Sequence, residues 1–142
     1  MLQDFTLRVI QNIENMLYKN ILLIDDDIDD AELFLEVINS LKKEIVFSYA
    51  TNPLKALAEL KISENLPDLL FLDINMPCLN GLDFLNELRN DTRLRYIEVI
   101  LISSAPEDII RKNLSAKKYE IERYMSKSNN YNDFVAQIIT IL

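Results

Sequence analysis

Five short apolar runs with the residue types of β-strands alternate along this chain with stretches whose apolar residues have the spacing of α-helices. The strand-like runs lie at residues 21–25, 45–49, 69–72, 96–102 and 121–126. Strands that alternate with helices pair in parallel, because each crossover helix returns the chain to the same end of the sheet. The pattern predicts an α/β fold with a doubly wound, five-stranded parallel sheet and helices on both of its faces.

Polar residues, glycine and proline mark the starts of the helices. Asn52 and Pro53 are typical of an N-cap and a first helical residue, and Asn80-Gly81 opens another helical stripe. Pro106 is expected to start the fourth crossover helix. The last helix is predicted from about residue 130 to residue 142.

The residues before the first strand lie outside this alternation. Apolar residues recur there with helical spacing, beginning at Leu2, Phe5 and Val9. We therefore expect residues 1–19 to be a helical extension and residues 20–142 to be the one globular domain that a chain of 142 residues can build. The apolar stripe of the extension is expected to pack on the domain or to mediate self-association, as in a homodimer.

Composition excludes several classes of function. The net charge of -8 argues against nucleic acid and anionic membranes as partners. The chain has no histidine, which argues against zinc sites and serine-histidine hydrolases, and its single cysteine, Cys78, cannot form an intramolecular disulfide. No apolar run is long enough to span a membrane, and charged residues interrupt the N-terminal segment too often for a signal peptide. We expect a cytoplasmic protein.

Aspartates follow two of the predicted strands. Asp73 comes directly after residues 69–72, the most apolar run of the chain, while Asp25 and Asp26 follow the first strand. Ligands of open α/β sheets bind at the carboxyl ends of the strands. If the first and third strands are neighbours, the three carboxylates converge and repel one another, and Mg²⁺ is the natural ion to offset them.

A hydroxyl and an ammonium group are expected at the same edge. Ser103 ends the fourth strand and Lys127 follows the fifth. Beside a carboxylate that holds a metal, these groups suit a phosphoryl group, because lysine binds its anionic oxygens and a hydroxyl donates a hydrogen bond to them. The neighbouring Asp27, Asp29 and Asp30 are interpreted as solvated charges or as charges at a helix start.

Taken together, these residues resemble the receiver domains of two-component response regulators. The resemblance covers roughly residues 20–142 and implies a flavodoxin-like strand order of 2-1-3-4-5. Its signatures, in chain order, are Asp25-Asp26, Asp73 followed by Met76-Pro77 and Asn80-Gly81, then Ser103 and Lys127.

The resemblance also implies a role for each site residue. Asp73 is the phosphoacceptor. Asp25 and Asp26 bind Mg²⁺ directly or through water, together with Asp73 and the backbone carbonyl of Asn75.

Three more residues match the parts of the family that respond to phosphorylation. Lys127 pairs with the phosphoryl group, Ser103 is the switch hydroxyl, and Tyr124 matches the aromatic switch position. The surface that changes would comprise the helix after Pro106, the fifth strand and the last helix.

The implied function is phosphorelay signalling. The chain would accept a phosphoryl group on Asp73 from a histidine kinase or a phosphotransfer protein and signal by contact with a downstream protein. It would be no enzyme beyond its own phosphorylation and dephosphorylation. Because no effector domain follows, we expect a stand-alone receiver.

One departure from the family motivates a second hypothesis. Ser128 follows Lys127 where the family usually has proline after a cis peptide bond. A cis bond before a residue other than proline costs about 3 kcal/mol, which favours a trans loop and a different direction for Lys127. The alternative is a degenerate receiver that binds partners without being phosphorylated.

A third hypothesis is a magnesium-dependent phosphatase of the haloacid dehalogenase type. Residues 25–29 supply the two aspartates of that family's motif but lack its following hydroxyl or valine. The motif around Asp73 would also have no role in such an enzyme.

Overall fold

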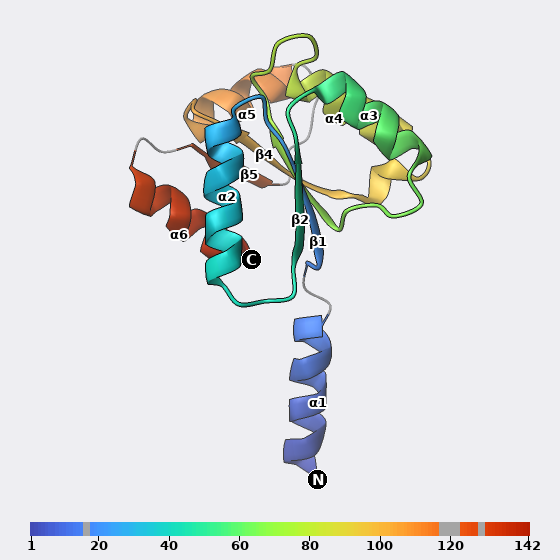
Figure 1. Cartoon of the computed structure of the whole chain (residues 1–142), viewed down its shortest axis with the longest axis vertical. Helices are drawn as coiled ribbons and strands as arrows, with labels where there is room; N and C mark the ends of the chain where they lie inside the picture. The colour runs from blue at the N-terminus through green and yellow to red at the C-terminus, as the bar shows by residue number, and fades with distance from the viewer. Residues whose placement is uncertain (16–17, 117–122, 128–129) are drawn as a thin grey trace.

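The computed structural model describes residues 1–15, 18–116, 123–127 and 130–142. They form one five-stranded sheet with the order β2-β1-β3-β4-β5, and all neighbouring strands pair in parallel (Figure 1). The predicted fold class and strand order are therefore confirmed. The strands are β1 (Asn20–Ile24), β2 (Val46–Ala50), β3 (Leu69–Asp73), β4 (Glu98–Ser103) and β5 (Arg123–Ser126).

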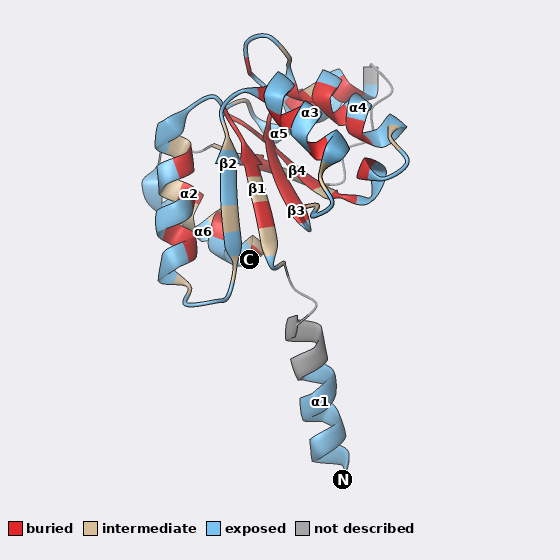
Figure 2. Ribbon diagram, turned by 45° about the vertical axis from the view of Figure 1, so that its right-hand side comes forward, coloured by how far each residue is buried: buried red, intermediate tan, exposed pale blue. Residues whose placement is uncertain are grey.

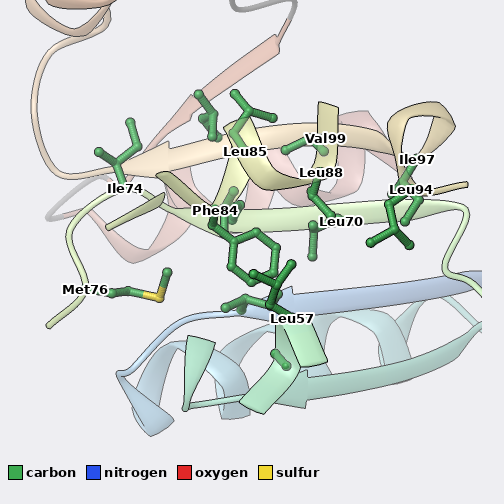
Figure 3. Close-up of a cluster of buried hydrophobic side chains, with 14 of the residues drawn as sticks. Leu57, Leu70, Ile74, Met76, Phe84, Leu85, Leu88, Leu94, Ile97 and Val99 are labelled. Atoms are coloured by element: carbon green, nitrogen blue, oxygen red, sulfur yellow. The ribbon is translucent and has the colours of Figure 1, made fainter. Parts of the chain in front are cut away.

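Helices cover both faces of the sheet. Those on one face are α2 (Ile28–Ser40) and α6 (Tyr131–Ile141); those on the other are α3 (Pro53–Ile62), α4 (Gly81–Asn90) and α5 (Glu107–Ala116) (Figure 1). Each set of helices encloses its own cluster of buried side chains against the sheet. In the larger cluster, Phe84 of α4 and Leu57 of α3 meet over the sheet (Figure 3). This two-faced burial is what a parallel sheet requires.

Burial follows the position of each strand in the sheet. All five residues of β3, the central strand, are buried, whereas the edge strand β2 has no fully buried residue (Figure 2). The most apolar run of the sequence thus supplies the central strand of the sheet. Its last residue, Asp73, is the one charged residue within β3.

Side-chain caps fix the starts of several helices. The Asn52 carboxamide accepts a hydrogen bond from the backbone N–H of Lys55, and Asn80 accepts one from that of Asp83. Both predicted starts are confirmed, with Pro53 as the first residue of α3. Asp27 caps α2 in the same way, through the N–H of Asp29.

The predicted fourth strand, residues 96–102, began two residues too early. Residues 94–96 form a short 3-10 helix, η1 (Leu94–Tyr96), and β4 begins only at Glu98. The cause is Asp91, whose carboxylate accepts hydrogen bonds from the N–H groups of Arg93 and Leu94 and closes a turn there. Leu94 is fully buried, while Tyr96 is left 82% exposed.

The N-terminal segment is a helix, α1 (Leu2–Asn15), that leads away from the sheet (Figure 1). Leu2 and Phe5 are 82% and 67% exposed, so this part of the stripe is not packed on the domain. The rest of the predicted extension lies partly outside the described residues, as does the predicted start of β5 at residues 121–122. None of the helices described here is long and apolar enough to cross a membrane.

Gly81, the only glycine of the chain, joins α4 to the end of β3. A Cβ atom at this position would lie 2.3 Å from the backbone oxygen of Asp73 and 2.7 Å from Cα of Ile74. The Gly81 N–H also donates to the carbonyl of Ile74 at 2.9 Å. The helix can approach the strand this closely only because residue 81 has no side chain.

We predict that Gly81→Ala lowers the free energy of unfolding by about 2–3 kcal/mol, because the new methyl group meets backbone atoms that cannot move aside. Chemical denaturation followed by circular dichroism measures this. The matched control is Asn86→Ala, at an exposed position of the same helix. It should leave stability unchanged or slightly raised, since alanine is the better helix former. Equal stabilities of Gly81→Ala and the wild type would contradict the close approach.

Candidate functional site

Strand pairing brings the predicted site residues to one edge of the sheet. Ile24 of β1 is paired with Leu72 of β3, so the residues that follow, Asp25 and Asp73, emerge side by side. On the other side of β3, the same edge carries Ser103 at the end of β4. Ser103 is paired with Ser126, the last residue of β5, directly before Lys127.

Three carboxylates gather at this edge. One oxygen from each of Asp25, Asp26 and Asp73 lies within 4.8 Å of the others. Asp25 and Asp73 are only 1% and 3% exposed, while Asp26 faces solvent. The predicted convergence of the acidic pair with Asp73 is therefore present.

The buried carboxylate of Asp25 has too little compensation for its charge. Its Oδ1 accepts a hydrogen bond from the N–H of Asp27 at 2.9 Å. Its Oδ2 has no hydrogen bond of good geometry, although the Lys127 ammonium lies 2.8 Å away. Burial raises the pKa of Asp25 to about 8, against the opposing effect of Lys127. Three carboxylates that converge around a buried oxygen with an ion pair but no well-oriented hydrogen bond fit a hard divalent cation such as Mg²⁺.

Both carboxylate oxygens of Asp73 have polar partners. Its Oδ1 accepts a hydrogen bond from the N–H of Asn75 at 3.1 Å, and its Oδ2 lies 3.2 Å from Nζ of Lys127. The carboxylate thus ends a rigid, fully buried strand and is oriented by the turn that follows it. A fixed carboxylate beside a cation is the arrangement of a nucleophile in covalent catalysis.

Lys127 is the one cation in contact with the carboxylates among the described residues. Its ammonium lies 2.8 Å from Asp25, 2.7 Å from Asp30 and 3.2 Å from Asp73. Burial opposes its charge, but the pairs with Asp25 and Asp30 outweigh burial and raise the pKa of Lys127. Its backbone N–H also donates to the carbonyl of Ser103 at 2.8 Å.

Ser128, which replaces the family's usual proline, lies outside the described residues, so the expected trans peptide stays a prediction. The Lys127 ammonium nevertheless reaches Asp73. Loss of the proline does not turn this side chain away from the site.

Ser103 is fully buried next to the carboxylates. Its Oγ accepts a hydrogen bond from the Asn75 carboxamide at 3.1 Å and another from the N–H of Ala105 at 3.2 Å. Asn75 therefore connects the loop after β3 with the end of β4. A shift of the Ser103 hydroxyl would break both of these contacts.

Tyr124, on β5, is half-buried and is joined to the same loop. Its hydroxyl donates to the backbone carbonyls of Ser103, at 3.2 Å, and of Ala105. Burial raises the pKa of this hydroxyl. Because it bonds to backbone on both sides of Ser104, Tyr124 is coupled to any movement of this segment.

Asp30 is the site residue that the sequence analysis missed. It was interpreted as a solvated or helix-start charge, yet its carboxylate makes the shortest contact of the Lys127 ammonium. The helical spacing of the sequence could have indicated this position, since Asp30 precedes the buried Phe34 by four residues and the buried Val37 by seven. Those spacings place Asp30 on the face of α2 that packs on the sheet.

Comparisons with known proteins agree with this site. The family model described as "Response regulator receiver domain" matches residues 21–139. The transcriptional regulatory protein MalR of Bacillus subtilis is 34% identical over 123 residues, which cover 79% of this chain and 49% of MalR. The chain spans about half or less of the length of the curated relatives that it matches.

Solved structures agree as well. The phosphorylated cyanobacterial phytochrome response regulator RcpA superposes with a TM-score of 0.75 and 25% identity, over 87% of this chain and 91% of RcpA. The Mn²⁺-bound form of the response regulator Rcp1 superposes with a TM-score of 0.74 and 26% identity, over 87% and 91% of the two chains. With its matched sequence, its strand order and its acidic edge, the chain belongs to the response regulator receiver domain family.

Proposed function

We propose that this receiver domain accepts a phosphoryl group on Asp73 from the phosphohistidine of a histidine kinase or a phosphotransfer protein. The observation that carries the proposal is the buried Asp73 carboxylate, which lies within reach of both the acidic pair and the Lys127 ammonium. The domain then signals by contact with a downstream protein. Its only chemistry is its own phosphorylation and dephosphorylation.

Asp25, Asp26 and Asp73, with the backbone carbonyl of Asn75, would hold the Mg²⁺ ion of this site. When bound, the ion supplies positive charge that offsets the carboxylates and the oxygens of the incoming phosphoryl group. The convergence of the three carboxylates supports this assignment, as does the buried Oδ2 of Asp25, which has an ion pair but no hydrogen bond. The Mn²⁺ in the related Rcp1 structure supports it further.

The residues of the chain carry out the transfer itself. A carboxylate oxygen of Asp73 forms a bond to phosphorus while the P–N bond of the phosphohistidine breaks and its electron pair leaves with the imidazole nitrogen. The Lys127 ammonium stabilises the charge on the equatorial oxygens. Because Asp73 and Lys127 are already fixed, positioning and electrostatics supply most of the rate.

Ser103 and Tyr124 would convert the new charge into a change of surface. Ser103 is placed to donate its hydroxyl to a phosphoryl oxygen, which requires it to move from its contacts with Asn75 and Ala105. The Tyr124 hydroxyl bonds to the carbonyls of Ser103 and Ala105, so it would change position with this segment. We infer that α5, β5 and α6 form the surface read by the downstream partner.

The two other hypotheses have less support from the site. The Asp27 carboxylate caps α2, so it is not free to act as the second aspartate of a phosphatase of the haloacid dehalogenase type. A degenerate receiver gains no support from Lys127, since its ammonium reaches both Asp25 and Asp73. Self-association through the exposed apolar residues of α1 stays a prediction.

We predict that incubation with acetyl phosphate and Mg²⁺ adds one phosphoryl group to the protein, because the site binds the phosphoryl oxygens whatever the donor. Intact mass spectrometry measures the adduct. Asp73→Asn should carry none, and chelation of the metal with EDTA should prevent the adduct in the wild type. A wild-type protein that stays unmodified would favour the degenerate receiver, while steady release of inorganic phosphate that depends on Asp25 and not on Asp73 would favour the phosphatase.

We also predict that Mg²⁺ raises the melting temperature in the absence of any phosphodonor. An ion at ten times its Kd stabilises the folded state by about 1.4 kcal/mol, which raises the melting temperature by about 5 °C for a domain of this size. Asp26→Asn should abolish the rise, since it removes an exposed ligand without disturbing the core. Asp29→Asn, which removes a charge that faces solvent at the start of α2, is the control and should keep it. An equal rise in both variants would indicate general screening of charge.

A further inference from the structure

The Lys127 ammonium contacts a fourth carboxylate, that of Asp30, which lies outside the acidic triad of Asp25, Asp26 and Asp73. Its 2.7 Å contact with Asp30 is shorter than its contacts with Asp25 and Asp73. Asp30 lies in the first turn of α2, and Lys127 lies in the loop after β5. The pair therefore bridges the site across the sheet edge, and both side chains are about one-fifth exposed.

Asp30 differs from the triad in one important respect. The carboxylates that converge closely enough to hold a metal ion are Asp25, Asp26 and Asp73, and Asp30 is not among them in the part of the chain that the structure describes. An ion held by the triad would draw on the carboxylates of Asp25 and Asp73, which Lys127 also contacts. The contact with Asp30 is the one that need not be given up.

The contact with Asp30 does not prevent Lys127 from binding a phosphoryl group, because the ammonium has enough N–H donors for both. An ammonium group has three N–H donors and no acceptor. A bond to Asp30 uses one donor and leaves two for phosphoryl oxygens. The long, flexible lysine side chain would otherwise have to be ordered when the phosphoryl group arrives, at a cost in conformational entropy.

We propose that Asp30 is a positioning residue, which holds the Lys127 ammonium where the phosphoryl group on Asp73 is formed. The proposal rests on the proposed function, since it assigns Asp30 a part in that same phosphorylation. Asp30 acts through Lys127 and is not one of the three converging carboxylates, although it lies beside that of Asp25.

The test compares phosphorylation rates with limiting acetyl phosphate, at a Mg²⁺ concentration where the rate of each variant no longer rises. Asp30→Asn should be phosphorylated about tenfold more slowly than the wild type, a smaller loss than the ~10²-fold cost of removing a transition-state donor outright. Asp29→Asn is the matched control, because Asp29 is the neighbouring residue, is exposed, and loses the same charge. It should keep the wild-type rate. Asp30→Glu, which retains the carboxylate, should recover at least half of the loss.

Two further measurements separate positioning from a general effect of charge. Asp30→Asn added to Lys127→Ala should cause no further slowing, because its effect passes through the lysine. In ¹⁵N NMR spectra of the unphosphorylated protein with Mg²⁺, the Lys127 Nζ signal should stand apart from the exposed lysines in the wild type and in Asp29→Asn. In Asp30→Asn it should move toward them.

Equal rates for Asp30→Asn and Asp29→Asn would overturn the positioning role and leave the proposed function intact. A slowing by Asp30→Asn that persists without Lys127 would overturn it as well. A wild-type protein that takes up no phosphoryl group would overturn the proposed function, and the role of Asp30 with it.

Discussion

The parallel pairing of β1 with β3 is the constraint on which the rest of the site depends. It places Asp25 and Asp73 side by side at a buried edge, where each carboxylate is almost without solvent. Like charges in such surroundings are costly unless cations offset them. The Lys127 ammonium supplies part of that charge through its contacts with Asp25 and Asp73, but one cation does not balance three carboxylates. A metal ion bound by these carboxylates would supply the missing positive charge, and the same charge would offset the oxygens of an incoming phosphoryl group.

Close packing and hydrogen bonds of the surrounding fold hold this edge in place. Gly81 lets α4 pack directly on the backbone of Asp73 and Ile74, and Asn75 connects the following turn to Ser103. On the other side, Tyr124 is bonded to the backbone around Ser103. A change of charge at Asp73 can thus affect Tyr124 on β5 through a short series of hydrogen bonds, by way of Asn75 and Ser103.

Much of this arrangement could be predicted from the sequence, because it depends on local periodicity and on where strands end. The alternation of apolar runs gives the parallel sheet, and the polar residue after each strand must then lie at its carboxyl edge. The prediction that Tyr96 belongs to a strand was wrong. It relied on the β-propensity of tyrosine beside an apolar run and did not consider that Asp91 can close a turn by accepting backbone hydrogen bonds. Asp30 was missed for a different reason. A charge in the first turn of a helix has a sufficient local explanation, and its partner lies 97 positions away along the sequence.

A phosphoryl group on Asp73 would form a mixed anhydride, and reductive trapping with borohydride detects such a bond and locates it. Borohydride reduces an acyl phosphate to the alcohol, so the modified aspartate becomes homoserine and can be identified by mass spectrometry of peptides. We predict homoserine at position 73 alone, in protein treated with acetyl phosphate and Mg²⁺. Homoserine at Asp25 or Asp26, or a phosphoryl group that survives borohydride on a hydroxyl such as that of Ser103, would contradict it.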